Sequence, residues 1–197
     1  MTRRWPLFLG LFLGLSALFL GMTAGVNPVE ALQLAARWTA RVGFPVFLVA
    51  YSASSLGRLW PAGWTRALWR DRRWWGLGFA ASHTVHLFAL IAFLQASGET
   101  RPLSVYLVAG TGYVLMYLMV LTSSDAAMRA LGRNWKRLHT VGIHWLWFVF
   151  FASYAGRIMR PETMLQGTIG TALALGALGL RIAAWRQERR RSAAVTA

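Results

Sequence analysis

Apolar residues fall into six blocks, separated by short polar and basic stretches. Each block holds roughly 16–22 residues, close to the number that an α-helix needs to cross a hydrocarbon core about 30 Å thick. The pattern therefore predicts an all-α, multi-pass integral membrane protein built as a six-helix bundle. The predicted spans are Trp5–Met22, Val42–Gly57, Trp74–Leu94, Leu103–Thr122, Leu138–Tyr154 and Met164–Ala184.

Two connectors carry helix-start signals of their own. In the segment 23–41, Asn27 followed by Pro28 predicts an interfacial helix with Asn27 as its cap. In the segment 123–137, Ser123 or Ser124 is expected to cap a short cytoplasmic helix. We expect residues 1–185 to form one transmembrane domain and residues 186–197 a basic cytoplasmic tail. The first span is expected to be retained, because its apolar run is longer than that of a signal peptide and lacks an Ala-x-Ala cleavage pattern.

Composition narrows the class of protein. Of the 197 residues, 56% are hydrophobic and 14% are charged, whereas soluble domains carry roughly a quarter charged residues. This excludes a soluble enzyme, a secreted disulfide scaffold and a disordered chain. The chain has no cysteine, which excludes a thiolate metal site and an iron–sulfur cluster.

The net charge of +15 predicts orientation in the membrane and no nucleic-acid partner. Sixteen of the 21 Lys and Arg residues lie on one side, in the segments 3–4, 58–73, 129–137 and 181–191, and five lie on the other. Cytoplasmic connectors carry the excess of basic residues, so both termini are predicted to be cytoplasmic. Eight tryptophans fall near the same boundary, as expected for rings that anchor in lipid headgroups.

Histidine is the ionisable residue that the predicted spans contain. All six Asp and Glu residues lie outside the spans, which argues against a proton pump or a cation channel built on carboxylates. The four histidines sit in just two spans: His83 and His86 in the third, His139 and His144 in the fifth. Imidazoles from two facing helices are what axial ligation of a heme requires. Structural hydrogen bonding and a metal transporter are the alternatives, although divalent sites usually add Asp, Glu or Cys.

Spacing leaves the pairing of these histidines open. His83 and His86 are three residues apart and share one helical face. His139 and His144 are separated by about 140° around their helix, so at most one of them faces the partner histidines squarely. His83 and His144 each lie about 13 Å beyond a tryptophan that marks the boundary, which makes them one candidate pair. Mixed pairs, such as His86 with His144, are also open.

Two stretches resemble a known family. RRWWGLGFAASHTVHL (72–87) resembles the third helix of the ferric reductase-like transmembrane family. LTSSDAAMRALGRNWKRLH (121–139) resembles the cytoplasmic loop and fifth helix of one branch, the heme-binding membrane subunit of the bacterial periplasmic methionine sulfoxide reductase system. Asn27-Pro28-Val29 followed by Arg37 is similar to the external segment of that subunit. The similarity covers nearly the whole chain.

The resemblance implies a b-type heme, with His86 in the position of the third-helix ligand and His139 in that of the first fifth-helix ligand. Family members usually carry a second histidine on the fifth helix, and the corresponding residue here is Ala152. His83 and His144 are additional in this chain. The departure favours one b-type heme over two and leaves the ligand pairing undecided.

The implied function is electron transfer across a bacterial inner membrane. The donor would be a separate cytoplasmic flavin reductase or the quinol pool, because the chain has no Gly-x-Gly-x-x-Gly motif following a strand. FMN or a quinone would then come from the partner or from the membrane. The resemblance implies a periplasmic molybdopterin-containing acceptor, with ferric iron as the other candidate. A membrane ferric reductase, a quinol-linked cytochrome b and a histidine-containing metal transporter are the alternative functions.

Overall fold

The described part of the computed structural model, residues 4–196 with the side chains of 195 and 196 left out, is almost entirely helical and contains no strand. Its elements are α1 (Trp5–Ala24), α2 (Pro28–Leu59), α3 (Gly63–Arg70), α4 (Arg72–Ser97), α5 (Leu103–Leu121), α6 (Asp125–Leu131), α7 (Arg133–Ile158), the 3-10 helix η1 (Pro161–Thr163) and α8 (Met164–Thr196).

The long helices confirm the predicted class. Within residues 4–196, five helical segments are long and apolar enough to cross a membrane: α1, α2, α4, α5 and the segment formed by η1 with α8. The remaining long helix, α7, contains two histidines and three tryptophans, which lower its hydropathy. The protein is therefore an all-α, multi-pass membrane protein. The count of six spans and the orientation of the termini stay predictions.

Helix α2 differs from the expectation of a separate interfacial helix. It runs unbroken for 32 residues, so the segment after Asn27 and the second predicted span form one helix. Asn27 caps it as predicted, since its side-chain oxygen accepts a hydrogen bond from the Glu30 backbone N–H at 2.9 Å. Ala35 and Ala36 are buried and pack in a cluster with Ala89 and Phe93 of α4. Burial of this face between helices, rather than at a lipid interface, makes the segment part of the bundle.

Two further predictions concern the cap of the short cytoplasmic helix and the C-terminal tail. Of the two predicted caps, Ser123 and Ser124, it is Ser124 that caps α6. Its side chain accepts a hydrogen bond from the Ala127 N–H at 3.0 Å. Helix α8 runs from the sixth predicted span into the predicted tail, and the division between residues 185 and 186 stays a prediction. Arg58 at the end of α2 forms an exposed ion pair with Glu188 of α8.

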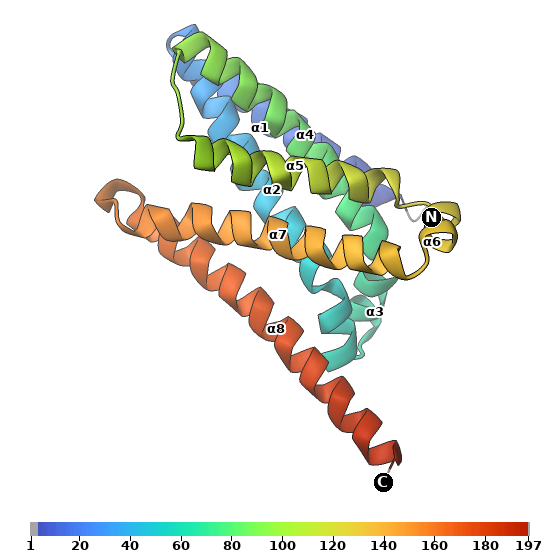
Figure 1. Ribbon diagram of the computed structural model, residues 1–197. Coiled ribbons are helices and arrows are strands. Elements are labelled where there is room, and N and C mark those ends of the chain that lie inside the picture. The colour runs from blue at the N-terminus through green and yellow to red at the C-terminus, as the bar shows by residue number, and fades with distance from the viewer. Residues whose placement is uncertain (1–3, 197) are drawn as a thin grey trace.

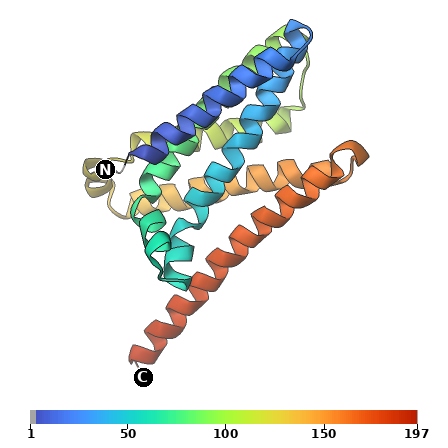
Figure 2. The ribbon, with the colours of Figure 1, turned by 180° about the vertical axis from the view of Figure 1, so that it is seen from behind.

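The helices form two groups. Helices α1, α2 and α4 run side by side, whereas α5 and α7 cross over them and α8 packs along α7 (Figures 1 and 2). The turns that join α1 to α2, α4 to α5 and α7 to α8 lie toward one end of the molecule, opposite α3 and α6 (Figure 1). Helix α5 is loosely packed, with Gly112 and Met116 as its buried residues.

Helices α1 and α4 touch backbone to backbone. A Cβ added at Gly10 would lie 2.2 Å from the Gly78 carbonyl oxygen, and one added at Gly78 would lie 2.3 Å from the Pro6 carbonyl oxygen. Only glycine fits at this crossing, as in other membrane helix contacts built on small residues. The contact fixes the position of α4, the helix that carries His83 and His86.

Candidate functional site

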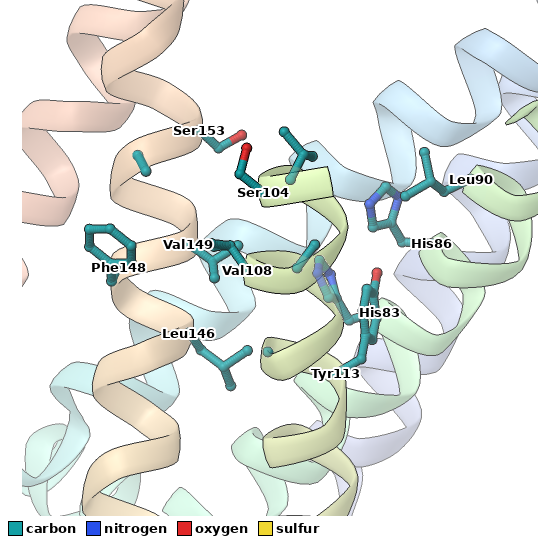
Figure 3. Close-up of a pocket in the computed structure, with 14 residues that line it drawn as sticks. His83, His86, Leu90, Ser104, Val108, Tyr113, Leu146, Phe148, Val149 and Ser153 are labelled. Carbon is teal, nitrogen blue, oxygen red and sulfur yellow. The ribbon is translucent and has the colours of Figure 1, made fainter. Parts of the chain in front are cut away.

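A cavity of about 460 Å³ lies between α4, α5 and α7. We call it the α4–α5–α7 cavity (Figure 3). Its volume falls within the roughly 300–1,000 Å³ that is usual for cofactor pockets. Helix α4 contributes His83, His86 and Leu90, while α5 and α7 contribute a mostly apolar wall: Ser104, Val105, Val108, Ala109, Gly112, Tyr113, Leu146, Phe148, Val149, Ala152 and Ser153.

Thr39 of α2 fixes the tautomer of His86. The Thr39 Oγ1 atom lies 2.7 Å from the Ala35 carbonyl oxygen and 3.1 Å from His86 Nδ1. The hydroxyl has a single hydrogen, which it donates to the carbonyl, so we assign the Nδ1–H of His86 as the donor to Thr39. His86 Nε2 therefore keeps its lone pair, which is the form in which a histidine binds a metal while its other nitrogen is held by a second group.

His83 is buried beside the same cavity. Its ring stacks on Phe79 and Tyr113, with centroid distances of 5.0 Å and 5.4 Å, and lies 4.9 Å from the ring of His86. Gly43 makes room for it, because a Cβ at Gly43 would lie 2.9 Å from His83 Nδ1. Within residues 4–196, His83 Nδ1 and the Tyr113 hydroxyl are buried and have no hydrogen-bond partner.

A second cavity, of about 430 Å³, lies at the other end of α7 and contains His139. We call it the Trp135 cavity. His139 Nε2 lies 3.2 Å from Thr122 Oγ1, and that hydroxyl donates to the Leu118 carbonyl at 2.7 Å. By the same reasoning, the Nε2–H of His139 donates to Thr122. The ring also stacks on Trp135 at 4.2 Å, so ligation through Nε2 would require this arrangement to break.

Cationic side chains surround the Trp135 cavity. Its lining includes Arg70, Arg72, Arg73, Lys136 and Arg181 together with apolar residues of α2, α4 and α5. Two carboxylates offset part of this charge. Asp125 pairs with Arg73 at 2.9 Å, and the buried Asp71 accepts hydrogen bonds from Arg70 at 2.9 and 2.8 Å, which raise the pKa of Arg70 above its ordinary value.

His144 lines neither cavity. Its Nδ1 lies 3.1 Å from the Tyr51 hydroxyl. Arg181 of α8 donates to the Tyr51 backbone carbonyl at 3.0 Å and lies over the Tyr51 ring at 4.6 Å. Sequence reasoning counted Arg181 among the boundary cations and missed this contact. The signal was present, because Arg181 falls inside the predicted sixth span, where a charge is costly and usually paired.

The structure thus divides the four predicted site residues. His83 and His86 share the α4–α5–α7 cavity, His139 lies in the Trp135 cavity, and His144 binds Tyr51. Neither the pair His86 with His139 nor the pair His83 with His144 lines a common cavity, and both pairings stay predictions. The apolar wall and the lone pair of His86 suit a heme held by one histidine, and the facing wall from α7 contains no nitrogen ligand.

The chain aligns along most of its length with curated proteins named "Protein-methionine-sulfoxide reductase heme-binding subunit MsrQ". The protein from Salmonella paratyphi B is 32% identical over 197 residues, which cover 89% of this chain and 89% of the relative. The chain belongs to the MsrQ family. A second MsrQ, from Salmonella dublin, is 31% identical with the same coverage, and that of Cronobacter sakazakii is 29% identical over 94% of this chain and 90% of its own.

Membership in the MsrQ family confirms the resemblance seen in the sequence. No family model matches the chain, and no solved structure matches it. The geometry of the site in this MsrQ-family member is therefore that of its own helices α4, α5 and α7.

Proposed function

We propose that this protein is the heme-binding membrane subunit of a protein-methionine-sulfoxide reductase system, and that it passes electrons from a cytoplasmic donor to a periplasmic acceptor. One observation carries the proposal. In a family whose curated members are named for heme binding, His86 lines an apolar cavity of about 460 Å³ and keeps an unprotonated nitrogen. Heme b, when bound, supplies the one-electron chemistry of its iron.

The residues of the chain orient and insulate that site. Thr39 holds the His86 ring in one tautomer and one rotation. Val108, Val149 and Leu146 give the cavity an apolar lining, and such a lining influences the reduction potential of a bound heme through the local dielectric. The cavity spans residues 104–113 of α5 and 146–153 of α7, in the half of these helices nearer the proposed periplasmic end.

The donor side is proposed to be the end with α3 and α6, in the cytoplasm of a bacterium and against its inner membrane. The excess of Lys and Arg at this end follows the positive-inside pattern. Arg72 and Lys136 at the Trp135 cavity would attract an acidic flavoprotein or the phosphate of FMN, and the quinol pool is the alternative donor. A periplasmic methionine sulfoxide reductase is the proposed acceptor.

The test is heme content and the dithionite-reduced spectrum of detergent-purified variants. We expect His86→Ala to lose most of its heme, because it removes the nitrogen that we propose as the iron ligand. His144→Ala is the matched control, since it removes a histidine of α7 that lies outside both cavities, and it should retain heme. Size-exclusion profiles establish that both variants remain folded. Full heme content and an unchanged spectrum in His86→Ala would contradict the proposal.

A further inference from the structure

The two long walls of the α4–α5–α7 cavity differ in chemistry. Both histidines come from α4, whereas α7 contributes Leu146, Phe148, Val149, Ala152 and Ser153 to the lining. We propose that the heme iron receives a single protein nitrogen in this cavity, and that the coordination position on the Ala152 side binds a small exogenous ligand such as imidazole or carbon monoxide. This inference rests on the proposed function and adds a ligand site to it.

His83 and His86 cannot act as the two axial ligands of one heme. Axial ligands approach the iron from opposite faces of the porphyrin, so the macrocycle has to pass between them. These two side chains lie three residues apart on one helix, with ring centroids 4.9 Å apart and planes inclined by 44°. They occupy the same side of the cavity, and His86 is the one whose tautomer is fixed by Thr39.

The other two histidines lie outside this cavity. His139 lines the Trp135 cavity, and His144 lines neither cavity and is hydrogen-bonded to Tyr51. Tyr113 lines the α4–α5–α7 cavity, but its ring stacks on His83 at an inclination of 20° and so lies on the histidine side. A neutral phenol is also a weak iron ligand, and its unpartnered hydroxyl is better suited to donate a hydrogen bond to a small molecule in the cavity.

Ala152 leaves the opposite position both empty of ligands and accessible. Its methyl group has no lone pair to offer. It is exposed along the cavity wall, as is its neighbour Ser153. Ser153 is hydrogen-bonded to the Arg157 side chain through its Oγ atom at 2.7 Å, so that hydroxyl is already used. The site therefore accepts neutral ligands that can reach it through an apolar environment, whereas ions pay a large desolvation cost there.

The experiment uses the full-length holoprotein in detergent, with heme content measured separately as the pyridine hemochrome. We expect a high-spin ferric spectrum that converts to low-spin as imidazole is added, and stoichiometric binding of carbon monoxide to the dithionite-reduced protein. Ala152→His should be low-spin without added ligand and should bind imidazole at least about tenfold more weakly. Ala155→His is the matched control, since residue 155 lies one turn further along α7 outside the cavity lining, and it should behave like the unmodified protein.

The possible failures are distinguishable. A heme-loaded protein that is low-spin and binds neither imidazole nor carbon monoxide would overturn the open position and leave heme binding intact. A protein without heme would overturn both proposals. If Ala152→His does not fold, Ala152→Leu takes its place. That variant should stay high-spin but bind imidazole more weakly, because it fills the position without supplying a nitrogen. Unchanged imidazole affinity in Ala152→Leu would place the ligand elsewhere and contradict the assignment.

Discussion

Thr39 is a residue without redox chemistry that contacts the proposed iron ligand, His86. Its hydroxyl is buried and receives the Nδ1–H of His86. We expect Thr39→Ala to retain part of its heme but to shift the midpoint potential, since the histidine loses the group that fixes its orientation. Removal of such a partner typically lowers metal affinity by roughly 10–100-fold. Heme retention during dilution and a potentiometric titration measure the two effects.

The conservative variant provides the control for Thr39. Thr39→Ser keeps the hydroxyl, so its midpoint potential and heme content should equal those of the unmodified protein. If Thr39→Ala and Thr39→Ser gave the same potential as the unmodified protein, the hydrogen bond would have no role at the iron. A purely structural effect of Thr39 would lower heme content without moving the potential.

Part of the site could be predicted from residue types alone. Histidines within apolar spans are rare, so the sequence alone predicts His83, His86, His139 and His144 as site candidates. Their separation from His139 could not be predicted, because it depends on the rotation and tilt of α4 and α7. The contact between Thr39 and His86 could not be predicted either, because the two residues are 47 positions apart in the sequence. The sequence also places Thr39 in an interfacial helix rather than in the bundle.

At the scale of elements, the backbone contact between α1 and α4 predicts a sharp steric effect. Gly78→Ala places a methyl group 2.3 Å from the Pro6 carbonyl oxygen, so the two helices must separate. We expect a loss of about 1–3 kcal/mol in the free energy of unfolding, the usual cost of overpacking. Thermal unfolding in detergent, followed by circular dichroism, measures it as a lower Tm.

Gly176→Ala is the matched control for this contact. It introduces the same methyl group in α8 at a position where nothing lies within 4 Å. Alanine is a better helix former than glycine, so this variant should be as stable as the unmodified protein or slightly more stable. Equal Tm values for Gly78→Ala and Gly176→Ala would show that α1 and α4 are not in backbone contact.

Helix boundaries followed from the sequence where a local signal determines them. Asn27, and either Ser123 or Ser124, are predicted as caps because side chains of this type accept backbone N–H groups at helix starts, and Asn27 and Ser124 are the caps observed. The continuity of α2 could not be read in the same way. Residues 31–43 are too polar on average to predict a span, and their inclusion in the bundle depends on burial of Ala35 and Ala36 against other helices.

For the whole molecule, the arrangement of connectors supports a topology that reporter fusions can test. Fusions after residues 65, 130 and 190 should report a cytoplasmic location, and fusions near 30, 99 and 160 an external one, because the first group lies among the excess of basic residues. The turns that contain residues 99 and 160 lie at the end opposite α3 and α6 (Figure 1). A cytoplasmic signal at residue 99 would exclude the six-span topology.

The shallow packing of α5 has a consequence for biogenesis. The α1–α2–α4 group and the α7–α8 pair bury their own interfaces, so both can assemble while α5, with only Gly112 and Met116 buried among its residues, is still displaced into lipid. Heme would then enter the α4–α5–α7 cavity laterally from the bilayer, and α5 would pack against α7 after the heme has bound. Limited proteolysis should therefore cleave heme-free protein first in the connectors around α5, near residues 98–102 and 122–124, and heme loading should slow that cleavage several-fold.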